Sequence, residues 1–504
     1  MTPILLIILL ALALAAAGVI LARVFFFTGP KGPPLSARPE ELPLLDCNSS
    51  VVTSSFPAGA FDADRDINAG TGGTFTGRVV RLTAPLNLTS DLIIVAKNDL
   101  TIAADIMVGA GTFNINMISL EGKVLVARGT TVTAGSRDKA DRVEVTGDPA
   151  RNPPATALAK AGGNGGQIQI SGVNVEIAGV VVAGSGGEGG SAMATGRGSQ
   201  LGQVPDPQNP GQTMTVDVPN RGGPPATATA VGGSGGYGGR IIVCARDSIG
   251  VRTDAQLIGG SGGDGGSAEA IADNGAPAYA RGGDGSRGGG VLMTSILGGQ
   301  CQIFLEAGSR LRGGNSSFAH GGDAQALGGK AYEDAPRSRR RGGDAIALAG
   351  KGGDGEGVSL LNCVVFNSGG ILQSGDGRDG GMAMAMGGRG ADSKVRGVAG
   401  DPGGDAEAGG GSGGKRGESP PYQTPNDPPG RPMGPIDPGA HGRGKNAAAT
   451  GGPGGSDPPN EKEGLSGKST AQGGSSGDGA SADRVLKPAQ VGSGEQALSS
   501  GKSI

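Results

Sequence analysis

The chain has 504 residues, of which 104 are glycine, and its formal net charge at neutral pH is −3. Aromatic residues make up 3% and tryptophan is absent, which excludes the large aromatic-rich core of an ordinary multidomain enzyme. Glycine does not follow the G-X-Y register of collagen, and the weakly acidic balance argues against nucleic acid, which needs a concentrated basic surface.

The N-terminal residues predict a membrane anchor. Residues 4–22 form an apolar run without a charge, and about 20 such residues cross a bilayer as a helix. No Lys or Arg precedes the run, whereas a cleaved signal sequence normally begins with a basic residue. We therefore assign residues 1–27 to a transmembrane anchor, with a signal sequence as the alternative, and expect residues 4–27 to contact the membrane.

Two observations disagree about the side of the membrane on which the rest of the chain lies. Arg23, Lys31 and Arg38 all follow the apolar run, and such positive flanks favour the cytoplasmic side. A glycine-rich, repetitive chain with few candidate catalytic residues favours the cell surface instead. We expect a single-pass protein of the cell membrane with its bulk outside the cytoplasm, or a secreted protein if the segment is cleaved. Residues 28–60 are then a linker.

Residues 61–161 predict the beginning of a β structure. Between Ser90 and Gly135 the sequence contains short Val/Ile/Leu runs without glycine-rich flanks. Repeat proteins commonly begin with atypical units that act as caps. We expect this region to supply the capping coils of the stack that follows.

Residues 162–408 contain a long repeat. Each unit has a glycine-rich segment such as GGSGGYGG, two or three short Val/Ile/Leu strands, and a second glycine-rich segment. Short β-branched runs bounded by Gly, Asn and Asp are typical of strands, and a long period is typical of stacked coils. The sequence therefore predicts an all-β fold, a parallel β-solenoid. The units start at Gly162, Gly232, Gly282 and Gly352, and Cys244, Cys301 and Cys363 each fall in a core strand.

Alanine alternates along both sides of each excursion from the stack, as in MAMAM at 382–386 and DAIALA at 344–349. This period of two predicts a flat strand whose alanine face packs closely against another surface. We interpret each excursion as a hairpin arm. The GGx segments beside it repeat every three residues, as the polyproline-II helix does, and predict ordered packing of neighbouring chains.

Residues 409–504 predict a disordered tail. They are rich in Pro, Gly, Ser and charged residues, as in SPPYQTPNDPPGRPMG from Ser419. Such a segment has little apolar surface to offset the entropy of ordering. We expect no packed structure after residue 408.

Aliphatic strands flanked by GGxGGxGG, between about residues 90 and 410, resemble the glycine-rich β-helix repeats of bacterial surface proteins and secreted adhesins. The resemblance implies a role in adhesion or in cell-envelope structure, although some β-helix relatives cleave polysaccharides. Phage-tail adhesins resemble this chain in the GGx element alone, and they lack the aliphatic strands found here.

Few residues predict chemistry. His320 and His441 are the only histidines, His320 is expected to be a solvated arm residue, and zinc and Walker motifs are absent. Asp264, Asp284 and Asp354 lie in GGDG sequences similar to calcium-binding repeats, but the aliphatic residue of that motif is missing. We expect ordinary turn chemistry there, keep calcium as the alternative, and predict no catalytic residue, metal or cofactor.

Acids in the expected core strands do not favour a carbohydrate-active enzyme. Such an enzyme needs clustered carboxylates on one sheet face, and platforms for stacking sugars are scarce without Trp and with four Tyr. We therefore predict that the chain is not an enzyme. The acids considered are Glu176, Asp247, Asp254 and Glu306.

The leading hypothesis is a membrane-anchored, exported structural or adhesive surface protein. A carbohydrate-active lyase or hydrolase is the first alternative, and an ice or crystalline-surface binder that uses the flat Ala- or Thr-containing arms is the second. Expected partners are the membrane and surface glycans or other envelope components, and no nucleic acid. Cys47 lies alone in the linker. We expect the three strand cysteines to be small core residues with free thiols, and a disulfide is the alternative if two of them lie on adjacent coils.

Overall fold

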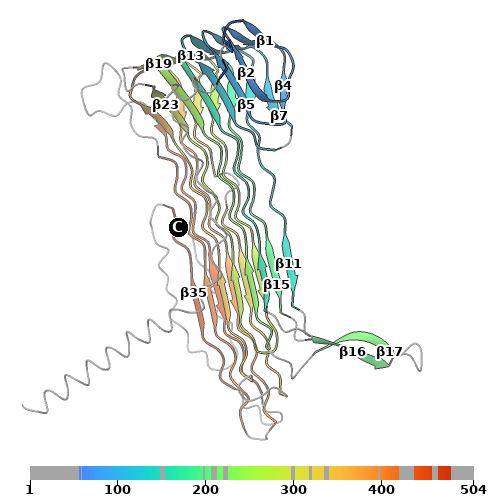
Figure 1. The fold of residues 1–504 in the computed structure, drawn as a ribbon. Coiled ribbons are helices and arrows are strands. Elements are labelled where there is room, and N and C mark those ends of the chain that lie inside the picture. The colour runs from blue at the N-terminus through green and yellow to red at the C-terminus, as the bar shows by residue number, and fades with distance from the viewer. Residues whose placement is uncertain are drawn as a thin grey trace, which may run out of the picture.

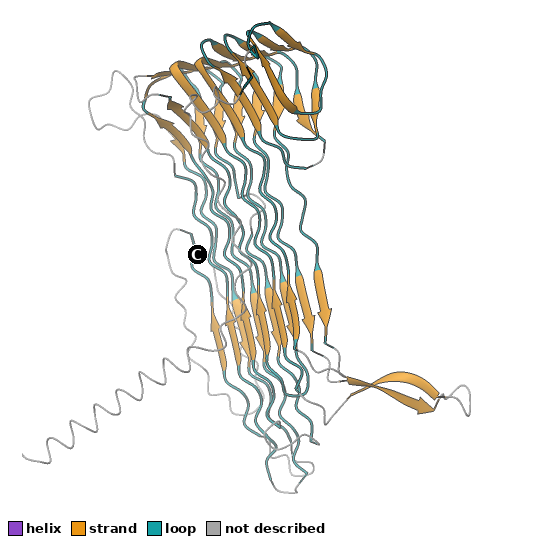
Figure 2. Ribbon diagram, in the orientation of Figure 1, coloured by secondary structure: helices purple, strands orange, loops and turns teal. Residues whose placement is uncertain are grey.

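The computed structural model describes residues 56–57, 59–109, 111–147, 154–196, 199–205, 213–219, 225–296, 301–316, 320–333, 340–394, 398–418, 436–456 and 464–477. Within these residues the protein is all-β, and no helix is present. Most strands pair in parallel with the equivalent strand of the next coil, an arrangement compatible with a β-solenoid (Figures 1 and 2).

One end of the molecule, which we call the head, contains a 13-stranded and an 8-stranded sheet (Figure 1). A full coil follows three sides of the head, two in the larger sheet and one in the smaller. The long strand β13 (Ile168–Ile177) covers two sides, because its first half pairs with β8 (Ile115–Ser119) and its second half with β9 (Lys123–Val126). The next coil repeats this arrangement in β19 (Ile241–Val251).

The remaining head strands divide among the three sides. The first side also contains β2 (Gly73–Gly77), β5 (Leu92–Ala96), β23 (Val291–Ser295) and β28 (Val358–Leu361). The second also contains β1 (Arg65–Ile67), β3 (Val80–Leu82), β6 (Leu100–Ile102), β24 (Cys301–Leu305) and β29 (Cys363–Asn367). The third contains β4 (Leu86–Leu88), β7 (Ile106–Val108), β10 (Thr131–Thr133), β14 (Val180–Val182), β20 (Gln256–Ile258), β25 (Arg310–Arg312), β30 (Ile371–Gln373) and β33 (Ile436–Asp437).

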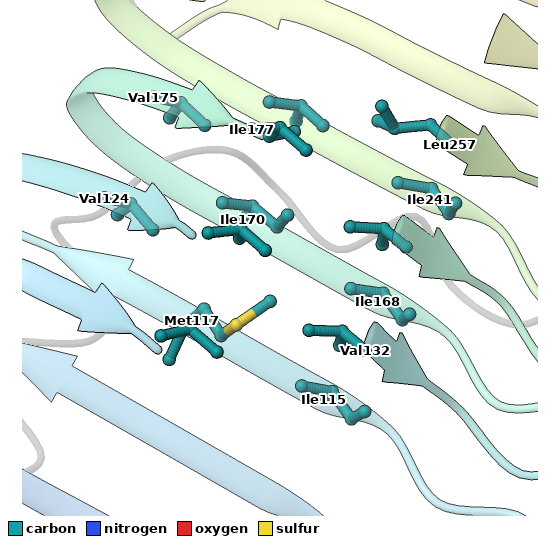
Figure 3. Packing of buried hydrophobic residues seen from close by; sticks show 14 of the residues in the cluster. Ile115, Met117, Val124, Val132, Ile168, Ile170, Val175, Ile177, Ile241 and Leu257 are labelled. Atoms are coloured by element: carbon teal, nitrogen blue, oxygen red, sulfur yellow. The ribbon is translucent and has the colours of Figure 1, made fainter. Parts of the chain in front are cut away.

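Aliphatic side chains fill the interior of the head, because alternate residues of every strand point inward. Ile115, Ile168 and Ile241 are partners in successive coils, are fully buried, and point into the same interior (Figure 3). Burying such a side chain contributes about 1.5–3 kcal/mol. The same stacking recurs from coil to coil and forms one continuous core.

From β10 onward each coil leaves the head after its third side and returns to its first side, and these excursions form the arm (Figure 1). The outgoing strands form a sheet of β11 (Val143–Thr146), β15 (Ala192–Thr195), β21 (Ala268–Ile271), β26 (Ala324–Leu327), β31 (Ala383–Met386) and β34 (Ala447–Thr450). The returning strands form another of β12 (Ala155–Leu158), β18 (Ala228–Val231), β22 (Ala278–Arg281), β27 (Ala345–Leu348), β32 (Ala406–Gly409) and β35 (Ser469–Gln472).

The alanine faces of these two sheets pack against each other. Ala326 and Ala347 are fully buried, and they belong to one cluster made almost entirely of alanine. The expected alternation is therefore present, but the hairpin interpretation needs a correction. Outgoing and returning strands are not hydrogen-bonded as a hairpin, since each pairs in parallel with its equivalent in the next coil. An antiparallel hairpin does occur in β16 (Ser199–Pro205) and β17 (Thr213–Pro219), which project from the far end of the arm (Figure 2).

Glycine-rich segments connect the head to the alanine sheets as a second hydrogen-bonded layer. Gly260 donates to the carbonyl of Gly239 across the arm, and Gly289 donates to that of Gly260, so a zigzag of bonds crosses between outgoing and returning segments. Within each layer the N–H donates to the next coil, as Gly262 does to Asn315. Ordered packing of the GGx segments is therefore observed.

The prediction that packed structure ends at residue 408 is wrong. Strands β33, β34 and β35 lie after residue 409, and they pair with β30, β31 and β32 of the preceding coil. Their alanines Ala447 and Ala449 are buried in the arm. Short runs such as AAAT have too little apolar surface to fold alone, but the preceding coil provides a template. Residues 436–456 and 464–477 thus extend the stack, and residues 478–504 lie outside the described part.

The predicted anchor at 1–27 and most of the linker at 28–60 lie outside the described residues. In the part of the chain that the structure describes, a helix with the length and apolarity needed to cross a bilayer is not found. The first described strands, β1 to β10, share the two head sheets with the later coils.

Candidate functional surface

Each turn of a glycine segment directs three N–H groups to three different partners. Gly322 donates across the arm to the backbone carbonyl of Gly283, and Gly321 donates to the backbone carbonyl of Asp379 in the next coil. The third residue, His320, faces outward and donates its backbone N–H to the Asp264 carboxylate of the preceding coil at 2.6 Å. The outward N–H therefore receives a side-chain acceptor that compensates for the missing backbone partner.

Nine aspartates in the described part of the arm make the same contact, at 2.6 to 2.9 Å, with a backbone N–H of the following coil. They explain why Asp follows GG so often in the sequence. We expected these carboxylates to bond within a local turn. Instead, they accept hydrogen bonds from the next coil. These aspartates are Asp264, Asp284, Asp323, Asp344, Asp354, Asp376, Asp379, Asp392 and Asp405.

The calcium candidates are not brought together by the fold. Asp284 and Asp354 accept from the backbone of Lys351 and Lys415, respectively, on the returning side of the arm. Asp264 lies on the outgoing side, where burial raises the pKa of its carboxyl. Among the described residues, a group of three or more His, Cys, Asp or Glu able to hold a metal ion is not found. The structure thus gives these carboxylates a hydrogen-bonding role.

Carboxylates of the head lie in ion pairs that span several coils. The Arg252 guanidinium contacts Glu176 at 2.8 Å and Glu306 at 2.6 Å, and Lys123 also pairs with Glu176. Arg252 holds the pKa of both carboxyls below the ordinary range. Glu176 stands opposite Gly250 in the next coil, so these acids do not fall at equivalent coil positions.

The other two acids of the head also lie in ion pairs. Asp247 pairs with Arg246 and Asp254 with Arg128. All four acids considered in the sequence thus neutralise neighbouring cations.

Among the described residues, the largest group of exposed methionines lies on the outer face of the outgoing sheet. Met382, Met384 and Met386, which we call the methionine face, are 55%, 48% and 46% exposed. Their exposure follows from the period of two, because Ala383 and Ala385 occupy the buried positions between them. Exposed apolar surface of this kind marks interaction sites more often than isolated residues do.

A groove of about 500 Å³ crosses this face at right angles to the strands. Its lining includes one residue from each of five successive strands in register: Met193, Glu269, Gln325, Met384 and Ala448. The chemistry changes from coil to coil, so the row is not a repeated array of one side chain. This mixed row does not favour the regular surface that binding to ice or another crystal needs.

The cysteines differ from the expected set of free thiols. Cys301 and Cys363 are free, but Cys244 is disulfide-bonded and fully buried in β19. The sequence alone does not disclose this bond, since pairing depends on which chains the fold brings together. Cys47 lies outside the described residues.

Among the described residues, neither histidine belongs to a cluster that could hold a metal ion. His320 is exposed on the arm, as expected. His441 lies within the packed part of the predicted tail, where its Nδ1 accepts from the backbone of Arg416 at 3.4 Å.

Comparison of the chain with protein-family models, with curated proteins and with solved structures finds no match.

Proposed function

We propose that the protein is a membrane-anchored, exported structural or adhesive protein of the cell surface. In this proposal residues 4–27 hold the chain in the membrane, and a glycine-rich β-solenoid with polyproline-II-like segments extends from it. The observation that carries the proposal is the arm, where backbone donors of the glycine turns bond in three directions. Such cross-linking suits a stiff spacer that presents a surface at a distance.

The methionine face and its groove are the surface we assign to contact with surface glycans or other envelope components. The face lies outside the alanine core, and its methionine side chains are exposed. Equivalent outward positions in neighbouring coils carry Glu269, Gln325 and Ala448. The methionine at position 384 is therefore compatible with contact to such a partner, while Glu269 and Gln325 in neighbouring coils supply polar groups.

Location is tested by expressing the full chain, and a variant lacking residues 4–22, in a bacterial host. We expect the full chain in the membrane fraction and labelled at lysine by a membrane-impermeant reagent applied to intact cells. The truncated variant should leave the membrane fraction. Recovery of the full chain as an unlabelled, soluble protein would contradict the proposal.

Adhesion is tested by retention of the full chain on surfaces coated with purified envelope polysaccharides. We expect Met384→Glu to weaken retention about tenfold, the equivalent of about 1.4 kcal/mol. Met107→Glu is the matched control, because Met107 is 47% exposed but lies alone on the head. Equal loss in both variants would show that the methionine face has no special role, and turnover of a polysaccharide would favour the enzyme alternative.

A further inference from the structure

Cys301 and Cys363 stand directly opposite each other at the end of the head. They are partners in the parallel pair of β24 and β29. Three residues further on, Phe304 and Phe366 are also partners, and their rings stack with centroids 5.0 Å apart. The two strands thus run at the ordinary spacing of about 4.8 Å, which lies within the Cα separation that a disulfide spans.

Both cysteine side chains face the interior. Cys301 is fully buried, and Cys363 is partly buried against the same aliphatic core. The Cys301 thiol donates to the backbone carbonyl of Gln302, with 3.8 Å between sulfur and oxygen, and Cys363 is its partner across the strand pair. Cys363 is the more exposed of the two, so it is the thiol that an oxidant in solution reaches first.

The cysteine pair lies at the edge of the sheet, between β24 and the outermost strand of the second side, β29. Among the pairings that the structure describes, β29 has one partner, β24, so it is the outermost strand of this side. Terminal elements of a repeat stack contact one neighbour and open most readily. A covalent bond between β24 and β29 would act where the head is least supported.

We propose that Cys301 and Cys363 form a redox modification site that closes into a disulfide and clasps β29, the last strand on the second side of the head, to the coil before it. The Cys363 thiol loses its proton and attacks a disulfide of an oxidant such as glutathione disulfide, so that a mixed disulfide forms while one thiolate leaves. The Cys301 sulfur then loses its proton and displaces the second thiolate. The two cysteine protons pass to the two departing thiolates, one S–S bond forms within the chain, and the oxidant is reduced to two thiols.

The proposal does not depend on export, because the oxidant is supplied in the experiment. The full chain is exposed to glutathione disulfide, blocked with an alkylating reagent, denatured, and digested for peptide mass spectrometry. We expect a cross-linked peptide pair containing Cys301 and Cys363, lighter by two hydrogens than the two peptides together. Glutathione attached to Cys363 without this cross-link, or no reaction at either thiol, would overturn the proposal.

The consequence for the head is measured by denaturant unfolding and by hydrogen exchange of β29. We expect oxidation to raise the unfolding midpoint and to slow exchange at residues 363–367, and both effects to vanish in Cys363→Ala. Alanine suits this position because Cys363 is only partly buried. A cross-link that forms without slowing exchange at β29 would refute the clasp. If Cys363→Ala does not fold, the mapping and exchange on the unsubstituted chain decide alone.

Discussion

The head and the arm hold the same parallel stack together by different means. In the head, large aliphatic side chains such as Leu257 and Ile303 fill the space within each coil. In the arm, that space is closed by alanine methyl groups and by glycine backbones that touch. Apolar transfer contributes about 1.5–3 kcal/mol for each large buried side chain, whereas the glycine layer has only backbone hydrogen bonds of about 1 kcal/mol each. A coil can therefore be stabilised either by large buried side chains or by the close approach of backbones.

The two regions should differ most in their response to one added or removed methylene. We expect Gly236→Ala in the arm to cost about 3 kcal/mol or more, because the new Cβ would lie 1.9 Å from the Gly163 carbonyl oxygen. Ile170→Val in the head should cost about 0.5–1.5 kcal/mol. Denaturant unfolding of the full chain measures both.

Gly473→Ala is the control for the arm. The nearest atom to its new Cβ is the Lys445 carbonyl oxygen at 3.8 Å, so the change should cost about 0.5 kcal/mol or less. If Gly236→Ala were tolerated as well as Gly473→Ala, the glycine layer would not be closely packed, and the contrast with the head would fail.

The alanine sheets give a second, smaller difference. Ala347→Leu should cost about 1–3 kcal/mol, because Ala347 is fully buried between two sheets and the larger side chain overpacks the contact. The adjacent change Leu348→Ser, on the outer face, should cost less than about 1 kcal/mol. Unfolding midpoints that fall equally in both variants would show that the faces of β27 are not distinguished.

The aspartate contacts of the arm are expected to be weaker than its glycine contacts. Asp284→Ala removes the acceptor for the Lys351 N–H and should cost about 0.5–1.5 kcal/mol. Asp284→Asn keeps an acceptor oxygen and should be nearly neutral. A chelator should leave the midpoint unchanged, because the carboxylate already has a backbone donor. Destabilisation by the chelator, or equal effects of both variants, would favour a calcium site.

The ion pairs of the head should have the smallest effect and a defined pH dependence. Arg252 depresses the pKa of Glu176 and Glu306 in the folded state, so their contribution is present above the unfolded pKa. It is lost as pH falls through the folded pKa. Arg252→Gln should therefore cost about 1 kcal/mol or less at pH 7, since solvent screens these partly exposed charges.

Unfolding at two pH values tests this prediction. As pH falls through the folded pKa of Glu176 and Glu306, the Arg252→Gln variant and the original chain should converge. Arg246→Gln is the control, because its pair with Asp247 is exposed on both sides and joins adjacent residues. A difference that persists in acid would mean that Arg252 acts by packing.

The sequence was sufficient for the local features of both regions. Strands such as IIVC in β19 and the buried alternation of Ala345 and Ala347 follow from periods that a short window contains. The end of the arm was missed, because residues 447–450 and 469–472 are stable as strands only against the coil before them. Their pattern does not carry that information.

The contacts between coils were also beyond the sequence. Asp264 reaches the backbone of His320 across 56 positions, and no local pattern specifies which residue comes to lie beside it. Likewise, the opposition of Cys301 and Cys363 depends on arms that leave and return without separating the head strands. Loop lengths differ from coil to coil, so spacing alone does not determine such a register.

The parallel pairing of every arm strand with the next coil has a consequence for load. Hydrogen bonds between neighbouring strands lie across the strand direction, so a pull along the arm shears the bonds of all coils at the same time. A pull that lifts the last coil away from the stack meets the bonds of one coil only and then those of the next. The arm therefore resists tension along its length far better than peeling at its terminal strands, β34 and β35.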